Sequence, residues 1–243
     1  MCCGGIQAES AERTGSQMRK LVGFLIVLLV LGVILDRVAV VGVQREIATR
    51  AMAKYDLDTP PEVTISGIPF LTQAIAGRYD EVKVAAGKLT LAGVTLSRVD
   101  FTLYGVTAPL EDLVLRADQV DMRAERVAGV VVVPVTTLNQ KAPQGIKVAV
   151  DGDGLNVSGE ITFLNQKVPA KATMKIELVE GGVQFVAQKV TLGEGISVPQ
   201  PERFITYKIP IKDLPFDLKV TGVKVVPEGL QIAGEAADVP LHD

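Results

Sequence analysis

Two periodicities divide the chain into an N-terminal helical part and a body of strands. Hydrophobic residues in 36–55 recur at helical spacing. They form one apolar stripe, which consists of Val40, Val43, Ile47 and Ala51. From Asp80 onward, hydrophobic and polar residues alternate instead, as they do in strands that are buried on one face. The clearest alternation is Val168–Leu178, which predicts an antiparallel strand with one face in water.

Shorter signals predict the elements that join these two parts. Val63–Ile65 is predicted to be a strand. Pro69–Ala76 is predicted to be a short helix because proline suits the start of a helix and the following Gly77 suits its end. A second short helix is predicted at Pro134–Leu138. At Gly222 the alternation of apolar residues changes phase, which predicts a β-bulge.

The composition of the body favours a curved, antiparallel sheet. Thirty-six residues of the chain are valine, whose β-branched side chain suits a pleated surface. Glycine turns between alternating segments predict hairpins, and bulges curl the sheet that the hairpins form. We therefore expect the body, about residues 45–243, to form one α+β unit in which an apolar helix face meets a curled antiparallel sheet. Its elongated apolar interior would either pack solid or take up acyl chains.

The N-terminal part contains a candidate membrane span. Leu21–Leu35 has no charged residue and would cover about 22 Å of a hydrocarbon core that is about 30 Å thick. A second apolar run, Val38–Val43, follows the pair Asp36 and Arg37, and Arg37 can extend its charge to the membrane surface. No small-residue cleavage site follows the run, so we expect a retained signal-anchor rather than a cleaved signal peptide.

Charge sets the expected orientation of this span and the division of the chain. Arg19 and Lys20 precede the apolar run, which predicts a cytoplasmic N-terminus and an exported body. Residues 1–17 are polar and are predicted to be a disordered cytoplasmic extension. Residues 18–43 would form the transmembrane signal-anchor, and residues 44–243 would form the α+β domain. The expected location is the cell membrane, with one pass and the C-terminal domain on the outer side.

Composition argues against most catalytic and nucleic-acid functions. The only cysteines are Cys2 and Cys3, and the only histidine is His242, next to the end of the chain. These positions leave the body without a cysteine nucleophile, a zinc cluster or a well-held histidine base. The net charge of −3 argues against a nucleic-acid partner. Asp151–Gly154 resembles the start of a calcium loop, but its flanks are strands, so we interpret it as a solvated hairpin turn.

Two features have both a structural and a functional interpretation. Ile68–Leu71 either belongs to the core or lines a space between helix and sheet. Lys167, Lys171 and Lys175 form a basic row on one face of a strand. This row either keeps the surface soluble or contacts lipid headgroup phosphates near a membrane.

The segments Gly67–Gln73 and Gly77–Val82 resemble the signature of the LmeA family of phospholipid-binding envelope proteins. The order of the anchor, the Pro134–Leu138 segment and the C-terminal hairpin agrees with this family, and the resemblance covers about residues 20–241. It implies an exported, envelope-associated actinobacterial protein with a fold similar to the tubular lipid-binding (TULIP) proteins. In this α+β fold, a long N-terminal helix packs in a strongly curved antiparallel sheet with short helices. It also implies a role in lipoglycan maturation beside an envelope mannosyltransferase, without catalysis and without a cofactor.

From the residues and the resemblance together, we expect a phospholipid-binding protein of the cell envelope. The side chains expected to line the acyl site are Phe70, Leu71, Ile75, Phe101, Leu103, Phe163, Met174 and Phe185, and those expected at the headgroup are Lys167, Lys171 and Lys175. The alternative is a non-catalytic scaffold with a solid core that binds an envelope glycosyltransferase and carries no lipid. An unrecognised hydrolase is the third interpretation.

Overall fold

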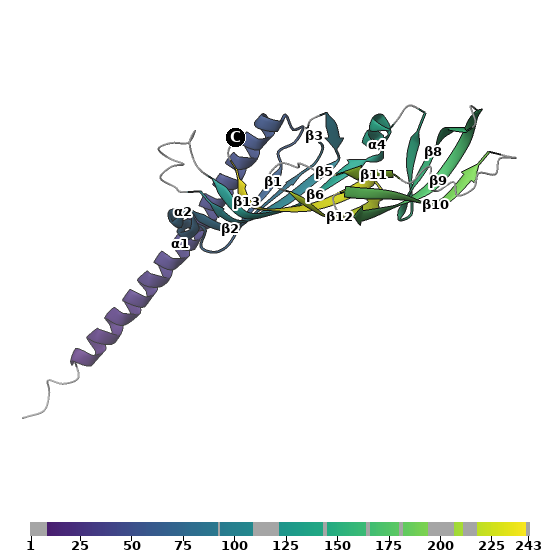
Figure 1. Cartoon of the computed structure of the whole chain (residues 1–243). Helices are drawn as coiled ribbons and strands as arrows, with labels where there is room; N and C mark the ends of the chain where they lie inside the picture. Colours follow the sequence, from purple (N-terminus) through teal and green to yellow (C-terminus); the bar gives the residue numbers. More distant parts are fainter. Residues whose placement is uncertain are drawn as a thin grey trace, which may run out of the picture.

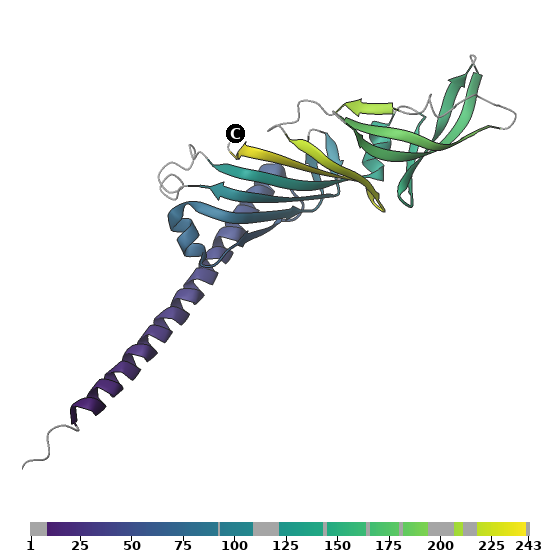
Figure 2. The ribbon, with the colours of Figure 1, turned by 60° about the horizontal axis from the view of Figure 1, so that its bottom comes forward.

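The fold is described here from a computed structural model of the chain, shown in Figure 1. It describes residues 9–91, 93–108, 122–142, 145–163, 166–179, 182–193, 207–210 and 218–241. A long helix leads into an elongated body of two antiparallel sheets that lie end to end (Figures 1 and 2). This arrangement agrees with the predicted α+β class.

Helix α1 (Glu9–Tyr55) joins the apolar segment to the body without a break. It begins at Glu9, inside the segment 1–17 for which the sequence predicts a disordered extension, and residues 1–8 lie outside the described part. The side chains of α1 that the body buries are Asp36, Val40 and Ala48, at intervals of four or eight residues. Val43 and Ile47, which the sequence placed on the packing stripe, are exposed. The body therefore covers a narrower stripe of α1 than predicted. This stripe includes Asp36 and leaves out Val43 and Ile47.

The first sheet has the strand order β1-β2-β5-β6-β13-β12. Its strands are β1 (Glu62–Ser66), β2 (Arg78–Ala86), β5 (Arg98–Thr107), β6 (Arg123–Pro134), β12 (Lys219–Val226) and β13 (Gly229–Pro240). The C-terminal hairpin joins this sheet because β13 pairs with β6 over its whole length, from Gly229 opposite Pro134 to Pro240 opposite Arg123. The predicted bulge at Gly222 is confirmed, since the pairing of β12 with β13 shifts between Val220 and Gly222.

The second sheet has the order β11-β10-β9-β8-β7. Its strands are β7 (Lys147–Asp151), β8 (Gly154–Phe163), β9 (Gln166–Val179), β10 (Gly182–Leu192) and β11 (Tyr207–Pro210). The predicted alternation in β9 is confirmed on the core side, where Val168, Ala170, Ala172 and Met174 are buried. Leu178, at the end of the same row, is exposed.

Short elements connect the layers. Helix α2 (Phe70–Ala76) follows β1, and its C-cap is Gly77 in the left-handed conformation with φ 65°. Helix α4 (Val135–Lys141) follows β6 and lies where the two sheets meet. A small hairpin, β3 (Leu89–Leu91) and β4 (Val94–Leu96), completes the described elements. The short helices lie where proline and glycine predicted them.

The sequence predicted one curved sheet around the helix, whereas the structure divides the strands between two main sheets. Helix α1 packs at one end of the first sheet, where Val40 shares a cluster with Ile65 of β1 and Phe70 of α2. The break between the sheets follows from the chain path, because α4 separates β6 from β7. Pairing partners so distant in sequence leave no local signal that would reveal this division.

Candidate lipid-binding surface

The two faces of the first sheet differ sharply in polarity. Cross-strand register places Val84 opposite Phe101, and Val99 opposite Val131. Val131 in turn lies opposite Ile232, which pairs with Val223. The half-buried apolar residues on this face are Val82, Val84, Val99, Phe101, Val127, Val131, Val223 and Ile232. Within the described part of the chain, no element covers them completely.

A similar apolar face continues on the second sheet. Leu155, Ala172, Met174 and Ala187 form a buried cluster there. The partly buried residues packed against this cluster are Leu138, Val148, Val150, Val157, Ile176, Phe185, Val190 and Val225. Val225 belongs to β12 of the first sheet, so it connects the two faces. We call the half-buried residues of both faces the apolar surface.

The opposite faces of the sheets are polar. On the first sheet, a groove of about 460 Å³ crosses the strands between charged side chains that include Glu62, Lys83 and Glu235. Arg98 and Asp100 line the same groove and form an ion pair of 2.5 Å. Val84, Phe101 and several alanine and glycine positions line the same groove, so it combines charged side chains with apolar ones.

The residues predicted to line one acyl site fall into three groups. Phe101 and Phe185 belong to the apolar surface, and Leu103 and Met174 are buried beneath it. Phe70 is 3% exposed and packs in the cluster with Val40 and Ile65. Leu71 and Ile75 point outward and are 39% and 78% exposed. The side chain of Phe163, at the end of β8, lies outside the described part. The structure therefore does not bring this set together around one cavity.

The predicted lysine row lies on the polar face of β9. Lys167 forms an ion pair with Glu160 at 3.7 Å, and Lys175 forms one with Glu177 at 3.1 Å. Lys171 has no ion pair with the residues that the structure describes, and it lines a polar groove of about 410 Å³ with Ser158 and Thr191. These lysines and the buried row of Met174 occupy opposite faces of the strand. A lipid on the apolar surface would have to pass the edge of the sheet to reach them.

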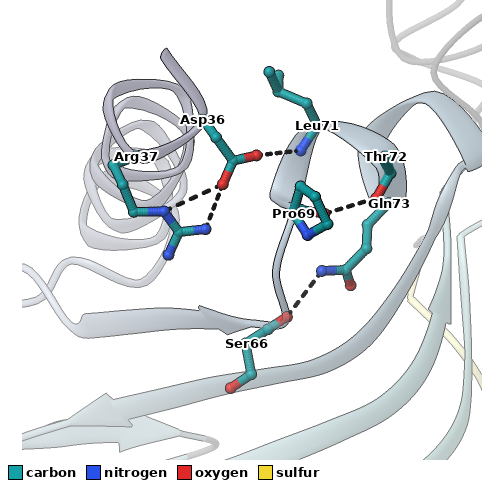
Figure 3. Close-up of polar contacts among 7 residues, drawn as sticks. All are labelled: Asp36, Arg37, Ser66, Pro69, Leu71, Thr72 and Gln73. Atoms are coloured by element: carbon teal, nitrogen blue, oxygen red, sulfur yellow. Dashed lines mark hydrogen bonds and ion pairs between the residues drawn. The ribbon is translucent and has the colours of Figure 1, made fainter. Parts of the chain in front are cut away.

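A polar network fixes α2 against α1 (Figure 3). The backbone N–H of Leu71 donates a hydrogen bond of 2.8 Å to Oδ1 of Asp36, and the guanidinium of Arg37 donates to Oδ2 of the same carboxylate. Asp36 is only 4% exposed. In the sequence, Asp36 marks only the end of the apolar run. Its bond to α2 leaves no local signal, because its partner lies 35 residues away.

The turn before α2 is held by a second set of bonds. Nε2 of Gln73 donates to the carbonyl oxygen of Ser66 at 3.2 Å, and Oε1 of Gln73 accepts from the N–H of Asp80 at 3.0 Å. Gly67 adopts φ 104° and approaches Gln73 so closely that a Cβ atom there would lie 2.2 Å from Nε2. The signature residues Gly67 and Gln73 thus set the position of α2.

Beside this turn, the side chain of Glu81 on β2 forms a hydrogen bond with β1. The Oγ of Ser66 donates a hydrogen bond of 2.8 Å to Glu81, and Nζ of Lys83 lies 2.9 Å from the same carboxylate. The hydrogen bond from Lys83, and then that from Ser66, hold the pKa of Glu81 below its ordinary value of 4.5. The same pair raises the pKa of Lys83 above 10.5.

One described helix is long and apolar enough to cross a membrane, and its span covers Met18–Tyr55 of α1. A family model described as LmeA-like phospholipid-binding matches residues 34–235. This range includes α2, both sheets and the end of α1. No curated protein and no solved structure matches the chain.

Proposed function

The chain belongs to the LmeA-like phospholipid-binding family, and we propose from this that its body holds phospholipid acyl chains along the apolar surface. The observation that supports the proposal most is that this surface continues from the first sheet to the second through Val225. Covering it with hydrocarbon is favourable by about 0.8 kcal/mol for each buried CH₂ group. A long, half-buried strip of valine and phenylalanine side chains therefore suits an extended chain of methylenes.

We further propose that α1 anchors this body to the membrane from outside the cytoplasm. The apolar side chains of Leu21–Leu35 are exposed in the structure, as expected of a segment surrounded by lipid. Arg19 and Lys20 precede the segment and favour a cytoplasmic N-terminus. The lipid-binding body would then face the cell envelope, where it holds or passes phospholipid close to the membrane.

The resemblance to envelope proteins supports a more specific role. We propose that the protein supports lipoglycan biogenesis by binding rather than by catalysis, beside an envelope mannosyltransferase. We propose a TULIP-like mode of lipid binding, which the long helix and the two antiparallel sheets support. The alternative, a scaffold for a glycosyltransferase without lipid cargo, predicts a protein that carries no lipid at all.

Headgroup recognition by the lysine row stays a prediction. Lys171 is the best candidate, because Lys167 and Lys175 each have an acidic partner. Lys171→Gln should weaken binding to anionic phospholipid vesicles more than Lys175→Gln does. Equal effects of the two variants would mean that the lysine row only keeps the surface soluble and does not recognise a headgroup.

Native mass spectrometry of the full chain, followed by lipid extraction, tests the proposed binding. We expect phospholipid in a fixed ratio to protein. Phe101→Asp should lose this lipid because it places a carboxylate on the apolar surface. The matched variant Thr102→Asp places the same charge on the opposite face of β5 and should keep it. A wild-type protein without lipid would contradict the proposal and favour the scaffold.

A further inference from the structure

Three apolar side chains at α2 point away from the body. Ile68 is 82% exposed, Ile75 is 78% exposed and Leu71 is 39% exposed. Leu71 and Ile75 are four residues apart and so share one side of the helix, and Ile68 immediately precedes it. Phe70, on the other side, is buried. We call Ile68, Leu71 and Ile75 the α2 patch.

Two contacts set the position of the α2 patch along the axis of α1. The N–H of Leu71 is bonded to Asp36, and Phe70 packs with Val40 one turn further along. Figures 1 and 2 both show α2 at the end of the body from which α1 emerges. The α2 patch therefore begins at the level where the charge-free run Leu21–Leu35 ends.

The run Leu21–Leu35 is too short to cross the hydrocarbon core of a membrane by itself. Fifteen residues cover about 22 Å, about 8 Å less than a hydrocarbon core of about 30 Å. A bilayer around α1 would thus extend about five residues beyond Leu35, to about Val40. Val38, in this interval, is an exposed apolar residue. Asp36 and Arg37 are also in the interval. The carboxylate of Asp36 is shielded by Arg37 and by the N–H of Leu71, and the long side chain of Arg37 can extend its charge to the membrane surface.

We propose that the α2 patch inserts into the outer boundary of the same bilayer that α1 spans. This inference rests on the proposed anchor. The patch supplies apolar surface over the part of the hydrocarbon core that Leu21–Leu35 does not reach, and it stops the body from swinging freely about α1. Because Val82 packs against the cluster that contains Phe70, the patch also lies beside the start of the apolar surface. The lipid-binding face is thereby held next to the membrane from which lipid comes.

Tryptophan fluorescence can locate the α2 patch because the chain has no tryptophan. Three variants of the full chain carry one each: Ile75→Trp in the patch, Leu28→Trp in the charge-free run, and Lys224→Trp on the polar face of β12, opposite the apolar surface. All three positions are exposed, so a larger side chain has room. Each variant is reconstituted in phosphatidylcholine–phosphatidylglycerol vesicles whose acyl chains are brominated, and quenching is compared with that in unbrominated vesicles.

We expect strong quenching for Leu28→Trp, intermediate quenching for Ile75→Trp and none for Lys224→Trp. Quenching of Leu28→Trp together with an unquenched Ile75→Trp would overturn the inference while leaving the anchor intact. If Leu28→Trp is also unquenched, the anchor itself fails and the inference fails with it. An Ile75→Trp that is shielded from iodide in water but unquenched by bromine would mean that a protein surface covers the patch, which also overturns the inference.

Discussion

The N–H of Leu71 and the carboxylate of Asp36, joined by a hydrogen bond of 2.8 Å, connect the short helix α2 to the long helix α1. This bond sets the angle and the height at which α1 meets the body. It also divides the signature segment into two parts, with Phe70 turned toward the core and Leu71 turned outward. In the proposed function, this contact sets the position of the body relative to the membrane.

Loss of the Asp36 carboxylate should loosen α2. A hydrogen bond to a charged acceptor contributes about 1.5–3 kcal/mol, so Asp36→Ala should speed amide exchange at Leu71 roughly tenfold or more. Asp36→Asn keeps an oxygen acceptor at the same place and should show a smaller effect. Hydrogen exchange of the full chain in detergent, resolved at α2, measures both. Unchanged exchange in Asp36→Ala would mean that packing of Phe70 alone holds the helix.

Glycine at position 67 should be required for the turn before α2. Gly67→Ala places a Cβ atom against Gln73 and forces a residue other than glycine into φ 104°. We expect the free energy of unfolding to fall by about 1–3 kcal/mol. Gly87→Ala is the control, because a Cβ atom there meets nothing within 4 Å. Urea unfolding of both variants in the same detergent tests the difference, and equal midpoints would contradict it.

Phe70 and Ile75 should differ in what they contribute to stability, although the sequence placed them in one site. Phe70→Ala removes a buried ring that lies 6.1 Å from the ring of Tyr79 and should cost about 3–5 kcal/mol. Ile75→Ala changes an exposed side chain and should cost less than about 0.5 kcal/mol in detergent. Thermal unfolding would show which residue belongs to the core. Similar losses for both variants would refute the assignment.

The ion pair between Glu81 and Lys83 should make stability depend on pH in the acidic range. The folded-state pKa of Glu81 is lowered, so its contribution is fully present above its unfolded pKa near 4.5 and is lost as pH falls through the lower folded value. Wild type should therefore lose more stability than Glu81→Gln between neutral pH and pH below 4.5. Both groups are partly exposed, so added salt should reduce the difference. A difference that salt leaves unchanged would point to the bond from Ser66 instead.

Local signals predicted much of the secondary structure. Proline before Phe70 and glycine at 77 gave the position of α2, and strict alternation gave the core face of β9. The division into two sheets could not be predicted, because the pairing of Gly229 with Pro134 depends on residues almost a hundred positions apart. Val43 and Ile47 were wrongly placed on the packing stripe. Apolar character alone cannot tell which side of a helix packs against the body.

The candidate site was predictable only in part. Alternation placed Phe101 and Phe185 on apolar faces, as the structure does. It could not separate buried Met174 from half-buried Phe101, since that depends on which elements cover each face. The valines of the apolar surface, such as Val99 and Val131, were missed as site residues because a valine in a strand is equally typical of a solid core.

The location of bound acyl chains tests the proposed function most directly. A phosphatidylglycerol with a photoreactive group near the end of one acyl chain would be bound to the full chain and cross-linked, and the labelled peptides would be mapped by mass spectrometry. We predict labels on the apolar surface, in β5 and β6 around Phe101 and Val131 and in β10 around Phe185. Labels confined to α1, or to the polar faces of the sheets, would contradict lipid binding on this surface.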